Sequence, residues 1–333
     1  MRLMYLVSFL LFLLSRLPLQ ECQYGDGEGV VGRFGDRILD AAYIADYNSV
    51  KSLLREVREQ QESGILTNKK QNNVNAVDTE GRNALHLCGL DPQEERLVVD
   101  DCCRRIAMML KSAGTDLNAT EKNGMNAVHY GATNGFPTFV TFLCKIGGVS
   151  CDEKDMEGRT PLLKAVAHGF KDTFYALYDN GASIHVSDSE GLSILHYVVR
   201  LIGNEKSNDA HRPFLVEVLK LGEISVDSKD HSGRTPLMYA AMNDDLETTS
   251  ELLKYGADPR VQDKYKVTAT SMAKNREIFV MLVGTAADLA VKEHERWMSQ
   301  QQEELENSLE DEGELEFREF LENSKIHPPI DEF

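Results

Sequence analysis

The fold of this chain is decided by residues 155–191, DMEGRTPLLKAVAHGFKDTFYALYDNGASIHVSDSEG. The stretch begins with an Asp-x-x-Gly turn, after which Thr160 supplies an N-cap and Pro161 a first helical residue that needs no N–H partner. Two short apolar helices follow, the second over residues 172–178, and the turn then returns at Gly191. Helices of about ten residues are not stable alone in water. The 33-residue unit is therefore predicted to be stable only when it stacks against copies of itself.

Copies of this unit recur along the chain. The turn returns with its glycine at Gly81, Gly124, Gly158, Gly191 and Gly233, at intervals of 43, 34, 33 and 42 residues. After each glycine a short apolar helix begins at a residue that is a good N-cap: Asn83, Asn126, Thr160, Ser193 and Thr235. One structural role is thus filled by three residue types.

These residues resemble the ankyrin-repeat family, which is marked by a 33-residue period and a Thr-Pro-Leu-His-x-Ala core. The best match is Gly233–Ala241, GRTPLMYAA, followed by Glu251–Asp258, ELLKYGAD. The resemblance covers residues 35–289. It implies an all-α repeat solenoid of about six to seven stacked repeats, each a helix-turn-helix with a β-hairpin turn, and a C-terminal acidic helical tail. It says little about function, because the family binds many unrelated partners.

The chain is predicted to have four segments: a signal peptide or membrane anchor at 1–22, a capping ankyrin repeat at 33–76, further ankyrin repeats at 77–290, and an acidic tail at 291–333. The apolar run from Leu3 to Leu14 is too short to span a bilayer comfortably and suits the core of a signal peptide. An uncleaved anchor is the alternative interpretation.

Two repeats are longer than the unit by about ten residues, around 91–101 and around 202–212. Insertions in solenoids map to loops on one face, often the binding face. Tolerated surface length is the alternative, because the entropy of loop closure grows slowly with length.

The acidic tail holds 14 acidic and 4 basic side chains, a net charge of −10 out of −18 for the whole chain. Trp297, Leu305 and Leu309 recur at multiples of four, which indicates a thin helical stripe. We expect a helix to about Leu309 and looser chain beyond it. The tail is compatible with docking on the last repeat, with binding a partner as an amphipathic helix, or with a solvated acidic segment.

The acidic composition argues against nucleic acid as a partner, since phosphate contacts need clustered Lys and Arg. Basic proteins or divalent cations are more compatible, although no EF-hand Ca²⁺ loop is present. The six cysteines contain no Cys-x-x-Cys pair, so a zinc site is not expected. Cys144 and Cys151 lie seven residues apart and could form a disulfide in an oxidising compartment.

Three features point to the secretory pathway, with the endoplasmic reticulum lumen or secretion as the location. The leader is one, and the sequon at Asn118, Asn118-Ala-Thr120, is an N-glycosylation acceptor just before a turn. The terminus Ile330–Phe333, IDEF, resembles the K-D-E-L retrieval signal at two of four positions. A cytoplasmic or membrane-tethered protein is the alternative, because most ankyrin-repeat proteins work in the cytosol or nucleus.

No catalytic motif is found, neither a nucleophile elbow, a zinc-protease helix nor a phosphate-binding loop. His86, His129 and His196 stand at the fourth position of the family tetrapeptide, where the resemblance implies hydrogen bonds between neighbouring repeats. They belong to different repeats and cannot share a metal. We expect no enzyme activity, cofactor, metal site or small-molecule substrate.

The resemblance implies a concave recognition surface built from hairpin tips and from the ends of the first helices. The tips are Thr79, Glu80, Arg82, Lys122, Asn123, Met125, Met156, Glu157, Arg159, Ser189, Glu190, Leu192, His231, Ser232 and Arg234, and the helix ends are Leu90, Asn134, His168, Arg200, Met242 and Asn243. Exposed Met and Leu side chains mixed with arginines suit a protein partner. We therefore expect a non-enzymatic scaffold or adaptor that binds a partner protein. The alternative from another class is a lumenal Ca²⁺-buffering or chaperone-like factor that acts through the acidic tail.

Overall fold

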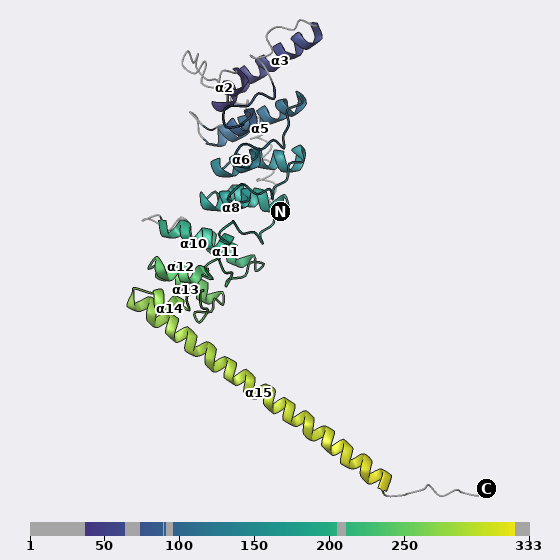
Figure 1. Cartoon of the computed structure of the whole chain (residues 1–333), viewed down its shortest axis with the longest axis vertical. Coiled ribbons are helices and arrows are strands. Elements are labelled where there is room, and N and C mark those ends of the chain that lie inside the picture. The colour runs from purple at the N-terminus through teal and green to yellow at the C-terminus, as the bar shows by residue number, and fades with distance from the viewer. Residues whose placement is uncertain (1–36, 64–73, 89, 91–95, 205–210, 324–333) are drawn as a thin grey trace, which may run out of the picture.

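The computed structural model describes residues 37–63, 74–88, 90, 96–204 and 211–323. They form seven consecutive helix pairs that stack in one direction, and the last helix then leaves the stack (Figure 1). The pairs are α2 (Arg37–Tyr43) with α3 (Tyr47–Ser63), α4 (Ala84–Leu87) with α5 (Arg96–Ser112), α6 (Ala127–Asn134) with α7 (Pro137–Thr141) and its π-helical continuation η1 (Phe142–Gly147), α8 (Pro161–Ala167) with α9 (Lys171–Asp179), α10 (Ile194–Asn204) with α11 (Arg212–Lys220), α12 (Pro236–Met242) with α13 (Leu246–Lys254), and α14 (Ala269–Met272) with α15 (Arg276–Asn323). The predicted all-α repeat solenoid is confirmed.

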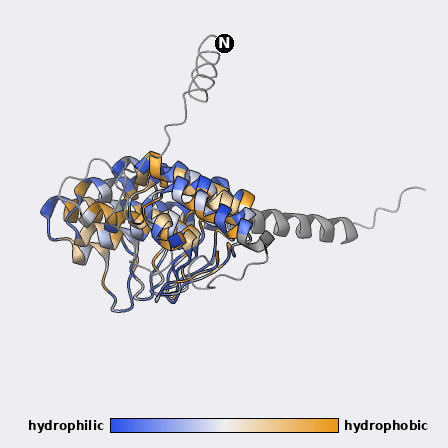
Figure 2. Cartoon of the chain, turned by 90° about the horizontal axis from the view of Figure 1, so that it is seen from above, coloured by the Kyte–Doolittle hydropathy of each residue, from blue (hydrophilic) through white to orange (hydrophobic). Residues whose placement is uncertain are grey.

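The pairs build two rows of helices. First helices pack on first helices, as α6 on α8 and α10 on α12, and second helices pack on second helices, as α5 on α7 and α7 on α9. The connecting turns project together from one side of these rows (Figure 2). Within the described residues no strand forms, and the hairpin turns carry only single bridges, such as Thr120 with Asn126.

Helix α8 shows how the repeat sequence produces its structure. The Thr160 hydroxyl accepts the N–H of Leu163 at 3.5 Å, and Pro161 occupies the first turn. Leu162 and Leu163 are both fully buried, so this two-turn helix presents its apolar side chains to neighbours on both sides. Burial of a Leu side chain contributes about 1.5–3 kcal/mol, which a helix this short cannot obtain without the adjacent repeats.

Each turn is closed by the carboxylate of its own aspartate. In the fourth repeat the Asp155 Oδ1 atom accepts the backbone N–H groups of Glu157 and Arg159, both at 2.9 Å. Gly158 adopts φ +73° within the turn, a conformation that is costly for residues with a Cβ. The same pair of bonds recurs at Asp78, Asp188, Asp230 and Asp263, whereas Glu121 accepts one such bond, from Met125.

Neighbouring turns are joined by a ladder of backbone hydrogen bonds. The N–H of Met156 donates to the carbonyl of Asn123 at 2.8 Å, and the N–H of Ser189 donates to the carbonyl of Glu157 at 2.9 Å. The same bond joins Lys122 to Glu80, His231 to Glu190 and Lys264 to Ser232. Six successive turns are thereby fixed at one spacing and in one orientation.

The three recurring histidines connect consecutive repeats, as predicted. The Nε2 atoms of His86, His129 and His196 lie 3.1, 3.2 and 3.0 Å from the carbonyl oxygens of Met125, Arg159 and Arg234. Each Nδ1 bonds to the N-cap residue of its own helix. Burial lowers the pKa of all three side chains and brings that of His129 to about 4, so they bridge the repeats as neutral imidazoles.

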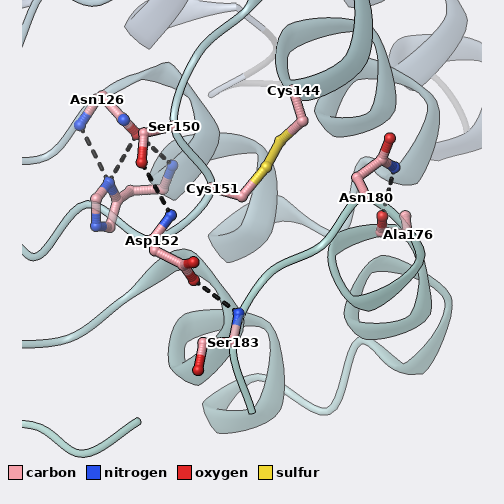
Figure 3. Close-up of a disulfide and its surroundings, with 9 residues drawn as sticks. Asn126, Cys144, Ser150, Cys151, Asp152, Ala176, Asn180 and Ser183 are labelled. Carbon is pink, nitrogen blue, oxygen red and sulfur yellow. Dashed lines mark hydrogen bonds between the residues drawn. A yellow bond between two sulfur atoms is a disulfide. The ribbon is translucent and has the colours of Figure 1, made fainter. Parts of the chain in front are cut away.

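A disulfide joins Cys144 in η1 to Cys151 in the following turn segment, a pairing that the sequence had left open (Figure 3). Next to it, the Asp152 carboxylate accepts the N–H of Ser183 from the next repeat at 2.9 Å. The disulfide therefore fixes the segment through which the third repeat is bonded to the fourth.

The expected end of the tail helix near Leu309 is wrong. Helix α15 begins as the second helix of the last repeat, with Ile278 and Leu282 fully buried, and it continues without a break to Asn323. The segment is rich in Glu, Gln and Ala and has no proline before Pro328, so nothing in it ends a helix that the last repeat has nucleated.

The two expected insertions are shorter than the sequence suggested. Residues 96–101 belong to α5 and residues 202–204 to α10. The remaining parts, 91–95 and 205–210, lie outside the described residues, as do the leader at 1–22 and the terminus at 324–333.

Replacing Gly158 by Ala is expected to destabilise the chain more than replacing Gly181. Both glycines have positive φ, but a Cβ on Gly158 would meet the Ser189 nitrogen at 2.6 Å, whereas nothing lies within 4 Å of one on Gly181. We expect a cost of about 1 kcal/mol for Gly181→Ala from the backbone alone and a further ~1–3 kcal/mol for Gly158→Ala from the clash. Urea unfolding of the two variants measures the difference, and equal losses would contradict the role assigned to the ladder.

Stability is expected to fall as the pH drops below about 6.5. The unfolded chain binds a proton at His129 near pH 6.5, while the folded chain does so only near pH 4. The stabilisation is therefore complete above pH 6.5 and lost towards pH 4, with ~2 kcal/mol lost between pH 7 and pH 5 through this side chain. Urea unfolding at both pH values should show a smaller pH dependence for His129→Leu than for the wild type, because the titrating imidazole is gone. Leucine is chosen because Leu163 holds the same motif position in the next repeat. The exposed-tip control His231→Gln should keep the wild-type dependence.

Candidate functional site

The predicted tip residues lie on one continuous edge of the solenoid. The backbone ladder places the tips of consecutive repeats side by side. Nine of the predicted tip side chains are exposed: Thr79, Glu80, Lys122, Asn123, Met156, Glu157, Ser189, Glu190 and His231. Met125, Ser232 and the three arginines are half-buried. The fold thus brings these tips together on one edge.

Leu192 is a correction to the predicted surface. Its side chain is only 2% exposed, so it cannot contact a partner. It follows the turn glycine, where three other repeats carry Arg82, Arg159 and Arg234. An arginine at this position keeps its charged end in water, whereas leucine has no polar end and turns inward.

Two of the three arginines are held in place by the aspartate of their own turn. Arg82 Nε lies 2.7 Å from Asp78 Oδ2, and Arg159 Nε lies 3.1 Å from Asp155 Oδ2. Burial alone would raise the pKa of Asp155, but hydrogen bonds from the Arg159 backbone and from Lys164 hold it below its usual value. The carboxylate therefore stays charged and orients the guanidinium.

The third arginine differs in its pairing. Arg234 Nε lies 3.8 Å from Asp263 Oδ2 of the next turn, beyond hydrogen-bond distance. Neither atom has a hydrogen-bond partner. The ion pair of this turn is therefore made between two buried atoms without a hydrogen bond.

The predicted helix ends extend the surface along the first helices. His168, Met242 and Asn243 are exposed at or just beyond the ends of α8 and α12, and Arg200 is exposed about one turn before the end of α10. Asn134 and Leu90 are half-buried. The surface thus runs from the tips to the far ends of the first helices.

The sequence analysis missed four side chains that lie between the tips and the ends of the first helices. Tyr130, Lys164, Tyr197 and Tyr239 follow the fourth position of the tetrapeptide in successive repeats. The hydroxyls of Tyr197 and Tyr239 donate to the turn carboxylates of Asp188 and Asp230, each at 2.8 Å, and Lys164 lies 3.0 Å from Asp155. The recurrence of Tyr at this one motif position is the signal that could have identified them.

The hydroxyls of Tyr197 and Tyr239 stay protonated and act as hydrogen-bond donors. Burial and the bond to Asp230 raise the pKa of Tyr239 to about 12, and burial and the bond to Asp188 raise that of Tyr197 further.

Tyr265, on the last tip, was also missed and is 75% exposed, the same as Met156. The surface therefore offers aromatic and Met side chains among fixed arginines and tyrosines.

The chemistry of this surface is that of recognition. Within the described ranges, no group of three or more His, Cys, Asp or Glu side chains is arranged to hold a metal ion. None of the helices in that part of the chain is both long and apolar enough to cross a bilayer. Arg, Tyr and Met are the side chains enriched in protein–protein interfaces.

Stacked helix pairs with a ladder of turns define a helical repeat protein, and comparison with known families specifies the class. The family model described as ankyrin repeats (3 copies) matches residues 97–188, 165–263 and 195–293. These matches together span more than half of the chain, and the chain therefore belongs to the ankyrin-repeat family.

Curated relatives share the repeats over part of their length. The B-cell lymphoma 3 protein homolog of Mus musculus is 26% identical over 186 residues, which are 55% of this chain and 40% of that protein. The nuclear factor NF-kappa-B p105 subunit of Gallus gallus is 26% identical over 234 residues, 69% of this chain and 21% of that protein. The chain spans less than half the length of these relatives, so the likeness concerns the repeats.

Solved structures agree with the fold. The crystal structure of the ankyrin repeat domain of Bcl-3 superposes with a TM-score of 0.56 at 20% identity, covering 74% of this chain and 97% of that one. The ankyrin repeat domain of human ASB11 gives 0.58 at 19% identity, with 74% and 96% covered.

Proposed function

We propose that this chain is a non-enzymatic scaffold or adaptor that binds a partner protein through the surface formed by the tips and first helices. The observation that carries the proposal is the continuous ladder from Glu80 to Lys264, which holds six tips in one row. A surface fixed before binding loses little conformational entropy when a partner docks. The row spans several repeats and suits an extended contact.

The composition of the row supports a protein as the partner. Met156 and Tyr265 supply apolar and aromatic anchors, each 75% exposed, and Arg200 lies exposed on α10, about one turn before its end. Anchors of these types dominate the binding energy of protein interfaces. The turn carboxylates that bind Tyr197 and Tyr239 keep the surroundings of these anchors rigid.

We place this function in the secretory pathway, with a cytoplasmic or membrane-tethered adaptor as the alternative. The apolar leader supports the proposal, as does the exposure of Asn118 and Thr120 in the sequon. The disulfide between Cys144 and Cys151 is the kind of bond that persists in oxidising compartments.

Photo-crosslinking from the tips is expected to capture the partner. A photoreactive amino acid at Met156 or Tyr265, each 75% exposed, should crosslink the same protein in cells. The matched control is Leu97 on α5, which is 77% exposed but lies in the other row of helices. Mass spectrometry of the adducts is the measurement. Adducts that form from Leu97 and not from the tips would overturn the proposed surface.

Full-length protein expressed in eukaryotic cells is expected to carry an N-glycan at Asn118 and a shortened N-terminus. Glycosidase treatment should increase its gel mobility, Asn118→Gln should abolish that change, and intact-mass determination should show the loss of the leader. Replacing the nearby exposed Asn123 by Gln is the control and should leave the glycan in place. An unshifted band together with an intact Met1 would favour the cytoplasmic or tethered alternative.

A further inference from the structure

Helix α15 carries an apolar line on the side turned away from the repeats. Ile278 and Leu282 face the stack and are fully buried, whereas Val280, Val291 and Met298 are 59%, 56% and 52% exposed. The exposed three are spaced by 11 and 7 residues, close to three and two helical turns, so they lie along one line. Val280 is two residues after Ile278, about 200° around the helix, which puts this line opposite the buried side.

The sequence continues the line along the rest of the helix. Leu305 follows Met298 by seven residues, Leu309 follows by four, and Phe320 by eleven. The backbone is helical throughout, to Asn323. These spacings keep the residues in register over roughly 60 Å of helix at 1.5 Å per residue.

The described chain does not cover this line. Figure 1 shows α15 running away from the stack after its first turns, and all side chains from Ala290 to Gln300 are exposed. The anchoring contacts lie beside the stack, where Arg260 makes two hydrogen bonds of 2.7 Å to Glu293. The line therefore begins at a fixed base and extends into solvent.

Charge restricts what can cover the line. Residues 301–323 contain ten acidic side chains and one basic side chain, Arg318. Several acidic pairs stand four residues apart, as Glu306 with Glu310 and Glu310 with Glu314, and such like-charge pairs destabilise a helix. A second copy of α15 would add to this repulsion, and an anionic membrane or nucleic acid would be repelled. An apolar surface edged with positive charge would both cover the line and relieve the repulsion.

We propose that α15 is a docking helix for a basic amphipathic helix of a partner protein, which packs its apolar face on the line formed by Val280, Val291, Met298, Leu305 and Leu309. The ten acidic residues that the sequence holds in 301–323 pair with the lysines or arginines of the partner. This surface is separate from the tips, so the protein has a second interface at the end of the solenoid.

Trp297 provides a reporter for this interface. It is the one tryptophan of the chain, is 55% exposed, and lies about 100° around the helix from Met298, at the margin of the line. A helix that packs on the line would partly remove its indole ring from water, so its fluorescence emission should shift to shorter wavelength.

The test titrates the full chain with a synthetic helix and follows this emission. The probe is a Leu/Lys peptide of roughly three heptads with leucines at the a and d positions. A Leu/Glu peptide of the same pattern and a scrambled Leu/Lys peptide are the controls. We expect a saturable blue shift with the Leu/Lys peptide alone, at least about tenfold weaker in 0.5 M than in 0.1 M NaCl because exposed charges are screened.

The variant Val291→Ser/Met298→Ser/Leu305→Ser is expected to weaken binding by at least about thirtyfold, since three apolar contacts are lost. The matched control is Leu97→Ser, which removes an equally exposed apolar side chain from α5 and should bind as the wild type does. Far-UV circular dichroism checks that the triple variant keeps its helix. If the variant has lost its helix, single Met298→Ser replaces it, with an expected weakening of about fivefold.

Three results would overturn the proposal. One is equal binding of the Leu/Glu peptide, and another is unchanged binding by a folded variant. The third is concentration-dependent dimerisation of the wild type in light scattering that the substitutions abolish, because a second copy would then be the occupant. None of these results affects crosslinking from Met156, so failure here is distinguishable from failure of the tip surface.

Discussion

The structure depends on one small interaction, the bond between an aspartate carboxylate and two backbone N–H groups of its own turn. In the fourth repeat Asp155 accepts these bonds from Glu157 and Arg159. The turn that results presents the N–H of Met156 to the preceding repeat and the carbonyl of Glu157 to the following one. Without the carboxylate, the backbone groups within the turn would lack partners, and the ladder between repeats would lose its fixed geometry.

This arrangement makes neighbouring repeats interdependent and distant ones nearly independent. Short helices such as α8 and α12 obtain their stability from the adjacent pairs, as expected of solenoids. The neutral imidazole of His129 adds a side-chain bond between repeats, and its burial ties that bond to pH. The same aspartates that hold the ladder also orient Arg159, Tyr197 and Tyr239, so the stability of the stack and the rigidity of its surface have one origin.

Helix α15 departs from this organisation. Its first turns belong to the last repeat, and Glu293 accepts hydrogen bonds from Arg260 of that repeat, while the remainder has no neighbours within the described chain. A solenoid normally ends in a polar face. Here the end of the stack continues as an extended, strongly acidic helix with an exposed apolar line, which gives the molecule two surfaces of different chemistry.

The sequence by itself determined the repeat unit, the number of repeats to within one, the interrepeat histidines and most of the tip row, because each depends on residues close together in the chain. The Asp-x-x-Gly turns, the N-caps and Gly158 act locally.

Only the tertiary structure decided the burial of Leu192, the hydrogen bond from Tyr197 to Asp188, and the cap on α7. That helix has no side-chain cap of its own, and Asp100 of the preceding repeat accepts the N–H groups of Thr138 and Phe139 instead. The tertiary structure also decided that α15 continues past Leu309, because packing in the last repeat nucleates the helix. The cap on α7 and the length of α15 depend on contacts between repeats. The burial of Leu192 and the bond from Tyr197 to Asp188 lie within one repeat and depend on how the side chains pack, which the spacing of residues does not specify.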